Sequence, residues 1–131
     1  MPLSLHVDGH KWRSHLDQMM SAKPGLVPVI KGNGYGFGLE LLAAESTRLG
    51  IETVAVGLAS EVSKVRTAFA GEIVILSPDH VSSGLTDAKI IQTISSIDLL
   101  QSIDANINVI VELLTPLNRH GIELSEIDRA L

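Results

Sequence analysis

Apolar positions along the chain recur with two periods, which predict short buried strands separated by amphipathic helices. The strand-like runs are five to seven residues long and rich in β-branched side chains, and they cover residues 3–7, 26–30, 53–57, 72–76, 89–94 and 107–113. The helix-like segments cover residues 8–22, 39–49, 60–69, 96–103 and 125–131. Asp8 and Ser125 stand at N-cap positions, and Gly50 follows the end of the second helix.

Two of the predicted helices have a clear apolar face. In the first helix, Trp12, Leu16 and Met19 or Met20 share one side, and the methionines are expected to fill space in the core. In the segment 60–69, the inward face consists of Val62, Val65, Ala68 and Phe69. Both helices are therefore expected to cover a sheet.

The strand-like runs are continuous rather than alternating, which is typical of parallel strands that are covered on both faces. Strand and helix alternate with short connections, which indicates an α/β fold built from βα units in a single domain, residues 1–131. Two architectures fit this order: an open doubly wound sheet, which is complete at about this length, or a (β/α)8 barrel, which typically needs about 250 residues. The chain ends inside a predicted helix, so we expect a fragment.

Pro28 lies inside the predicted strand 26–30. Proline has no N–H for the hydrogen-bond ladder, and a closed barrel has no edge strand on which to place it. Either the strand begins at Val29, or one amide position beside Pro28 is left unpaired.

Composition and charge narrow the class of protein. Of 131 residues, 45% are hydrophobic and 19% are charged, so a folded core is expected. Ten basic and fifteen acidic residues give a net charge of −5 without a basic cluster, which argues against a nucleic-acid partner. The chain has no cysteine, no apolar run near the roughly 20 residues of a membrane helix, and no secretory signal. We expect a soluble, cytoplasmic protein without a membrane partner.

The most informative segment is residues 27–38, V-P-V-I-K-G-N-G-Y-G-F-G. Lys31 ends an apolar row formed by Val27 and Val29, at the carboxyl end of a predicted parallel strand, where α/β proteins carry reactive groups. A partly desolvated lysine there would offer a neutral amine to an aldehyde, whereas an ordinary lysine at a strand end would be solvated. The glycines recur at every second residue, which fits neither G-x-G-x-x-G nor a P-loop.

This segment resembles the lysine motif of alanine racemases, V-V-K-A-N-A-Y-G-H-G. The departures are Gly32 and Gly34 for the two alanines and Phe37 for the histidine. The resemblance implies that Lys31 holds pyridoxal 5'-phosphate as a Schiff base and is one of two acid–base groups. It also implies that the hydroxyl of Tyr35 contacts the cofactor phosphate. The alternative for Tyr35 is a residue that closes the glycine loop with its hydroxyl in water.

Residues 109–121 resemble a second racemase segment, K-V-D-T-G-M-x-R-x-G, and match it at Thr115, Arg119 and Gly121. The resemblance implies that Arg119 lies beside the phenolic oxygen of the cofactor and the substrate carboxylate. The planar guanidinium suits a carboxylate and stays charged. Glu112 stands where the family often has a carbamylated lysine, whose negative charge faces that arginine. The alternative is a Glu112–Arg119 salt bridge without a catalytic role.

The histidines do not have the spacing of a metal site, and we expect none. The five residues, interpreted as ordinary surface histidines, are His6, His10, His15, His80 and His120.

The resemblance covers nearly the whole chain. It implies a pyridoxal-phosphate-dependent amino-acid racemase, an isomerase, of which the chain is the first five βα units of a (β/α)8 TIM-type barrel. In the family the second base is a tyrosine in a C-terminal β domain of the other subunit, so a homodimer is implied and the 131-residue chain alone is expected to be inactive. Two alternatives stay open: a non-catalytic pyridoxal-phosphate-binding module, and a small doubly wound α/β ligand-binding domain in which Lys31 is incidental.

Overall fold

The computed structural model describes residues 3–78 and 87–130. Its four strands are β1 (Thr53–Val56), β2 (Glu72–Ile75), β3 (Ile90–Ile94) and β4 (Asn108–Val111). The helices are α1 (Gly9–Ala22), α2 (Lys31–Tyr35), α3 (Leu39–Arg48), α4 (Val62–Arg66), α5 (Ile97–Ser102) and α6 (Ile127–Ala130), with 3-10 turns at Ala59–Glu61 and Leu124–Glu126. The predicted alternation of strands and helices is confirmed. None of the helices in the described residues is long and apolar enough to span a membrane.

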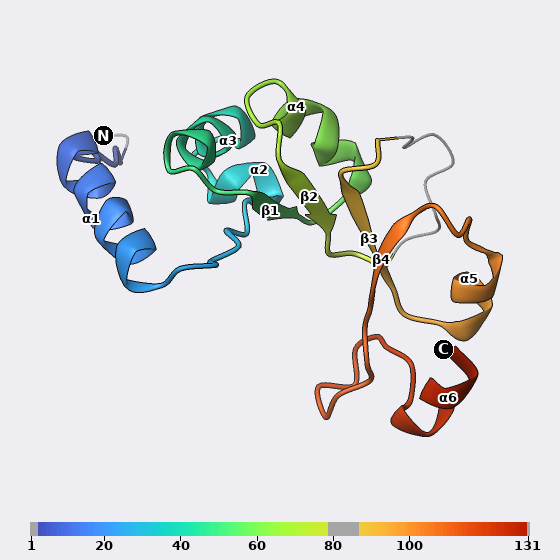
Figure 1. Cartoon of the computed structure of the whole chain (residues 1–131). Helices are drawn as coiled ribbons and strands as arrows, with labels where there is room; N and C mark the ends of the chain where they lie inside the picture. The colour runs from blue at the N-terminus through green and yellow to red at the C-terminus, as the bar shows by residue number, and fades with distance from the viewer. Residues whose placement is uncertain (1–2, 79–86, 131) are drawn as a thin grey trace.

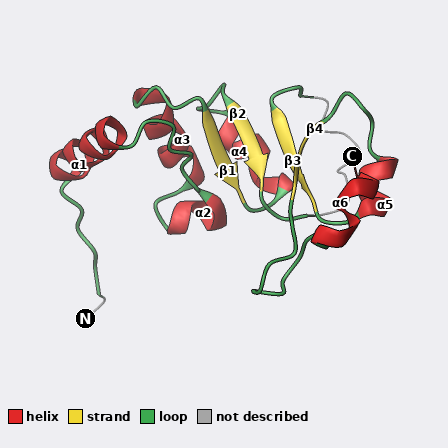
Figure 2. Ribbon diagram, turned by 60° about the horizontal axis from the view of Figure 1, so that its bottom comes forward, coloured by secondary structure: helices red, strands yellow, loops and turns green. Residues whose placement is uncertain are grey.

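The sheet has the order β1-β2-β3-β4, and each strand runs parallel to the one before it. Right-handed crossovers that always step in the same direction place their helices on the same face. Helices α3 and α4 indeed lie on one side of β1 and β2 (Figures 1 and 2). A doubly wound sheet reverses its strand order and carries helices on both faces. The described strands therefore wind as in a barrel.

The hydrophobic core lies between this sheet and the helices α3 and α4. Ile73 in the middle of β2 is fully buried between Val54 of β1 and Ile90 of β3, its register partners. Val65 of α4 is also fully buried, and Leu39 of α3 is 3% exposed. Each such aliphatic side chain contributes about 1.5–3 kcal/mol by leaving water. The predicted inward face of the segment 60–69 is thus confirmed.

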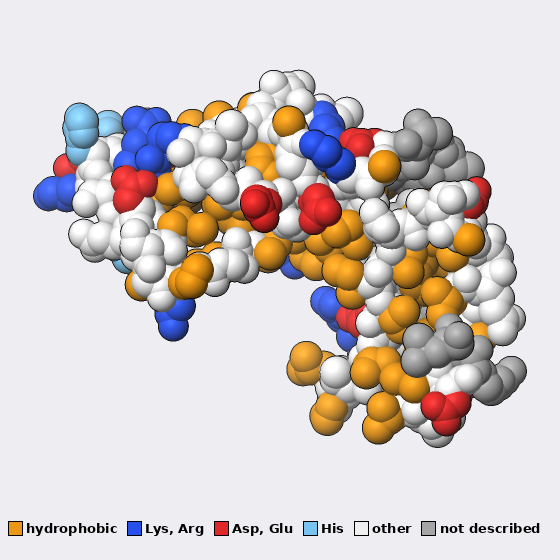
Figure 3. All heavy atoms as spheres, viewed as in Figure 1, with side chains coloured by type: hydrophobic (Ala, Val, Ile, Leu, Met, Phe, Trp, Pro, Cys, Tyr) orange, Lys and Arg blue, Asp and Glu red, His pale blue; other side chains and the backbone are white. Residues whose placement is uncertain are grey.

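The opposite face of the sheet is open in the described part of the chain. Val29 and Ile110, which lie on this face at either side of the sheet, are 41% and 45% exposed. The molecule forms an arc, with α1 at one end and α5 and α6 at the other (Figure 1). Hydrophobic side chains and a small group of basic and acidic ones lie in the hollow of the arc (Figure 3).

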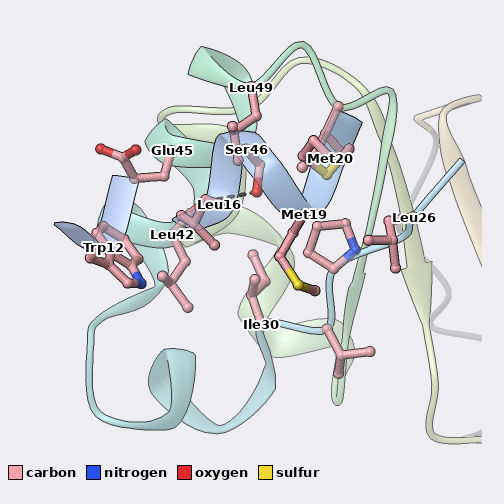
Figure 4. A pocket seen from close by; sticks show the side chains of 13 residues that line it. Trp12, Leu16, Met19, Met20, Leu26, Ile30, Leu42, Glu45, Ser46 and Leu49 are labelled. Atoms are coloured by element: carbon pink, nitrogen blue, oxygen red, sulfur yellow. Dashed lines mark hydrogen bonds between the residues drawn. The ribbon is translucent and has the colours of Figure 1, made fainter. Parts of the chain in front are cut away.

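Helix α1 begins as predicted, because the side chain of Asp8 accepts hydrogen bonds from His10 N at 3.1 Å and Lys11 N at 3.2 Å. The helix buries none of its residues. Its apolar side chains, among them Trp12, face α3 across a cavity of about 270 Å³ (Figure 4). The prediction that Met19 fills core space is wrong, since it is 42% exposed at this cavity.

The predicted strand 26–30 is reduced to a single parallel bridge between Val29 and Ala55. Ala55 N donates to Pro28 O at 2.8 Å, and Ile30 N donates to Ala55 O at 2.8 Å. The next step of a parallel ladder would need an N–H from residue 28, which proline lacks. The pairing therefore starts at Val29, the first of the two possibilities that the sequence left open.

Two further boundaries differ from the prediction. Residues 3–7 form no strand with the described residues. The last helical segment begins with a 3-10 turn whose N-cap is Glu123, so Ser125 lies inside the turn and is not a cap.

At the end of α3, Gly50 has a φ of +68°, which confirms the predicted stop because this conformation favours glycine. His80 lies outside the described residues.

Candidate functional site

Lys31 follows the Val29–Ala55 bridge by two residues and lies at the carboxyl end of the sheet, on its open face. Val29 is bridged to Ala55, and Lys31 lies beside Gly57 two residues further on, where a Cβ added to the glycine would be 3.2 Å from Cβ of Lys31. Ile30, between Val29 and Lys31, is 2% exposed and belongs to the core on the helix side. Of the predicted row of Val27, Val29 and Lys31, the last two therefore lie on one face, whereas Val27 has no strand pairing in the described residues. Lys31 itself is exposed, so the expected desolvation is not seen among the described residues.

The glycine loop after Lys31, which is the segment labelled α2, forms a left-handed turn rather than a regular right-handed helix. Five successive residues have positive φ: Gly32 at 62°, Asn33 at 52°, Gly34 at 63°, Tyr35 at 53° and Gly36 at 94°. This conformation costs a residue other than glycine about 1–2 kcal/mol, so Asn33 and Tyr35 need support from their surroundings. Gly34 N donates to Ile30 O at 3.1 Å, which closes the turn onto the end of the strand.

Lys31 and Arg119 line the same cavity, which has a volume of about 330 Å³. Its floor is a row of residues across the carboxyl ends of the strands, from Lys31 and Gly57 through Thr93 to Ile110. The remaining lining residues are Val74, Leu76, Ser77, Pro78, Glu112, Arg119 and His120. Parallel strands bring their carboxyl ends to one edge, which is why two segments far apart in the sequence meet there.

Arg119 and Glu112 form an ion pair in this cavity, with 3.4 Å between Nη2 of Arg119 and Oε1 of Glu112. The backbone of Glu112 is held on both sides, because its N–H donates to Ile94 O at 2.8 Å and its carbonyl accepts from Ile122 N at 2.9 Å. The second carboxylate oxygen of Glu112 is buried and has no hydrogen-bond partner among the described residues. The Arg119 side chain is 68% exposed, so the pair contributes little to stability and leaves the guanidinium accessible to a ligand.

Tyr35 does not line this cavity, and it is 63% exposed. The two residues after it turn back toward α1, where the Phe37 ring stacks on Trp12 with 5.8 Å between ring centroids. The structure thus brings Lys31 and Arg119 together and leaves Tyr35 outside. His120, interpreted from the sequence as a surface histidine, is exposed but belongs to the cavity wall.

Sequence reasoning missed Glu61, whose carboxylate joins the lysine segment to the end of β1. Its Oε1 accepts from Gly32 N at 2.8 Å, and its Oε2 accepts from Gly57 N at 2.8 Å and Leu58 N at 3.1 Å. Burial alone would raise the pKa of Glu61, but backbone N–H donors from Leu58, Gly57, Gly32 and Asn33 together lower it. Leu58 is the N-cap of the 3-10 turn, and Glu61 stands three residues after it, where a glutamate commonly bonds back to the N-cap N–H. This local signal does not predict the contact with Gly32.

The model of the family "Alanine racemase, N-terminal domain" matches residues 7–131. The alanine racemase of Campylobacter concisus is 35% identical over 108 residues, which are 82% of this chain and 31% of that protein. The alanine racemase of a Nitratiruptor species is 33% identical over 122 residues, 88% of this chain and 34% of that protein. The chain therefore spans about a third of the length of these curated relatives.

Solved structures of alanine racemases have the same fold. The enzyme from Oenococcus oeni matches with a TM-score of 0.72 and 26% identity, over 88% of this chain and 36% of that one. The structure from Bartonella henselae, described as an alanine racemase with covalently bound pyridoxal phosphate, matches with a TM-score of 0.70 and 19% identity, over 89% of this chain and 36% of that one. At 19% identity the second likeness concerns the fold alone.

Proposed function

The chain belongs to the alanine racemase N-terminal domain family, and we propose that it forms the cofactor-binding part of a pyridoxal-phosphate-dependent amino-acid racemase, with the cofactor held as a Schiff base on Lys31. Its fold is the corresponding α/β partial barrel of TIM type. Because the chain spans 31% of its Campylobacter relative, the activity, substrate and subunit partners of a whole racemase are part of the proposal.

The observation that carries the proposal is the shared cavity of Lys31 and Arg119. A primary amine can condense with an aldehyde, and a guanidinium binds a carboxylate or phenolic oxygen through its planar set of N–H donors. The cavity of about 330 Å³ lies in the range of about 300–1,000 Å³ that small-molecule sites occupy. One amine and one guanidinium facing the same space are a donor set that fits an anionic aldehyde. The pyridoxal phosphate in the Bartonella relative supports this choice of cofactor.

When bound, the cofactor supplies an electron sink for the negative charge that forms at the substrate α-carbon. The residues of this chain have separate parts in the proposal. Nζ of Lys31, as a free amine, takes the α-proton on one side of the substrate and returns a proton there in the reverse direction. Arg119 binds the substrate carboxylate, and Glu112, 3.4 Å away, keeps the guanidinium oriented.

Two features of the proposal involve groups outside the cavity. The hydroxyl of Tyr35 is proposed to contact the cofactor phosphate, which requires the exposed tyrosine to turn toward the cavity when the cofactor binds. Racemisation also needs an acid–base group on the opposite side of the substrate. We propose a tyrosine from the C-terminal domain of a second subunit, in a homodimer of the whole protein.

Borohydride trapping tests the assignment of Lys31. The gene is expressed to its natural stop codon, the protein is incubated with pyridoxal phosphate and reduced, and the modified peptide is located by mass. We expect one pyridoxyl adduct on Lys31 that is absent in Lys31→Ala and retained in Lys64→Ala, a control at an exposed lysine of α4. An adduct scattered over surface lysines, or no adduct, would show that the family's cofactor chemistry does not extend to this chain.

A further inference from the structure

Glu61 ties together two loops that leave neighbouring strand ends. It lies 29 residues after Gly32 in the sequence, in the 3-10 turn that follows β1. One carboxylate oxygen accepts from the lysine loop, and the other accepts from Gly57 and Leu58. Backbone N–H groups that converge on one anion in this way form a nest, which usually binds an external anion. Here a side chain of the same chain occupies it.

The loop that Glu61 holds has a conformation that it would not keep unaided. Gly32 to Tyr35 run through the left-handed region, and Asn33 and Tyr35 pay a steric cost for it. The donors of this loop to Glu61 are the N–H groups of Gly32 and Asn33, the first two residues of the turn. The carboxylate therefore stabilises the turn at the point where it leaves Lys31.

Lys31 is consequently held on both sides along the chain. Before it, Ile30 N donates to Ala55 O at 2.8 Å, and after it, Gly32 N donates to Glu61. A Cβ atom at Gly57 would lie 3.2 Å from Cβ of Lys31 and 3.2 Å from Oε2 of Glu61. The stem of the lysine, the carboxylate and the end of β1 thus meet in one small space.

We propose that Glu61 is a positioning residue for Lys31: its carboxylate fixes the left-handed turn to the end of β1 and so sets where the lysine amine stands in the cavity. The inference rests on the proposed role of Lys31 as the cofactor-binding amine. Among the described residues no ion pair joins Glu61 to Nζ of Lys31, and its carboxylate acts through the backbone N–H groups of the two loops.

The first measurement concerns the protein without cofactor and requires no variant. In amide NMR spectra of the wild-type protein, the signals of Gly32, Gly57 and Leu58 should shift together on acidification with one midpoint, because one carboxyl group titrates beside all three. The hydrogen bonds place this midpoint below the usual pH range of a glutamate. In Glu61→Gln the common titration should be absent.

The second measurement is trapping at Lys31 with pyridoxal phosphate and borohydride. Glu61→Gln keeps the size of the side chain but turns an NH2 donor toward N–H donors, so one loop loses its acceptor. We expect the yield of the Lys31 adduct at limiting cofactor to fall about tenfold, as for loss of one charge-assisted hydrogen bond, and the pH midpoint of the visible absorption of the Schiff base to move. Glu40→Gln, at an exposed carboxylate in the first turn of α3, should leave both unchanged.

Glu61→Asp provides a second variant if Glu61→Gln does not fold, since it keeps the charge on an arm too short to reach both loops, and it should lose the adduct similarly. Independent titration of the three amides in the wild-type protein would overturn the inference. An adduct yield and absorption midpoint equal to wild type in folded Glu61 variants would overturn it as well and leave the proposed function intact. Absence of the adduct in the wild-type protein would instead remove the proposed function, and the inference with it, even where the amides titrate together.

Discussion

Gly57→Ala adds one methyl group at the most crowded point of the cavity floor, between Lys31 and Glu61. The new Cβ would lie 3.2 Å from Cβ of Lys31 and 3.2 Å from Oε2 of Glu61. Carbon atoms pack best at about 3.5–4.0 Å, so one of the neighbours must move by about 0.3–0.8 Å. Lys31 cannot move freely, because Ile30 N is bonded to Ala55 O at 2.8 Å on one side and Gly32 N to Glu61 at 2.8 Å on the other.

The size of the effect is set by two opposing contributions. Overpacking of a tight site costs about 1–3 kcal/mol. Replacing glycine by alanine also restricts the unfolded chain, which stabilises the folded state by about 0.4–1 kcal/mol where the backbone conformation allows it. Gly57 does not have a positive φ, so this gain applies and the net loss should be about 0–2.6 kcal/mol. The displaced lysine stem should also lower the yield of the Lys31 adduct.

Urea unfolding followed by circular dichroism measures the stability, and borohydride trapping measures the adduct. The matched control is Gly9→Ala in the first turn of α1, where a Cβ meets nothing within 4 Å and φ is not positive. The control should be neutral or slightly stabilising, because only the gain in the unfolded state remains. A urea midpoint of Gly57→Ala at or above that of the wild-type protein, with unchanged adduct yield, would refute the crowding of Lys31 against β1.

Three further predictions follow from other parts of the molecule. Glu45→Gln removes the buried carboxylate that accepts from Arg13 at 2.8 Å, and should lower the free energy of unfolding at pH 7 by about 1–2 kcal/mol because the arginine is half exposed. The bond to Arg13 lowers the pKa of Glu45, so this contribution is present above the unfolded pKa and is lost as the pH falls through the folded one; an undiminished difference between wild type and variant in acid would contradict it. Gly34→Ala places a Cβ 2.9 Å from Leu42 Cδ1 at a φ of +63°. It should lower the urea midpoint more than Gly25→Ala, where φ is +83° and a Cβ meets nothing within 4 Å. Equal midpoints would show that the Leu42 side chain moves aside without cost. The 131-residue chain with pyridoxal phosphate should not interconvert L- and D-alanine in a chiral assay, since the second acid–base group is proposed to lie in another domain, and measurable turnover would refute this.

Local patterns in the sequence were sufficient for the order of the elements and for several boundaries. Asp8 caps α1 as predicted, because an aspartate side chain reaches N–H groups two and three residues further along the same chain. Ser96 likewise accepts from Leu99 N at the start of α5, where the sequence predicted a helix. The continuous β-branched runs predicted parallel strands, and the strands are parallel, although the second face of the sheet is open in the described residues.

The motif around Lys31 was also recognisable from the sequence, but its geometry was not. The sequence indicated a glycine-rich loop, whereas the structure shows a left-handed turn through Asn33 and Tyr35 that is hydrogen-bonded at Gly32 to a carboxylate 29 residues away. The same distance in sequence explains why Glu61 was missed. Tyr35 was predicted to contact the cofactor phosphate, and the structure places it 63% exposed outside the cavity, so this contact stays a prediction.

Periodicity, capping residues and the lysine motif determined the element types, the face on which Lys31 lies and the family resemblance, because each of these depends on residues close together in the chain. The tertiary structure decided between the two architectures that periodicity left open, because the strands follow one another in the order of a barrel, and it showed that the first pairing starts at Val29, after Pro28. It also decided that Arg119 faces the same cavity as Lys31 and that Glu61 holds the lysine loop. These contacts join distant segments, and they exist only after the parallel sheet has brought the carboxyl ends of its strands to one edge.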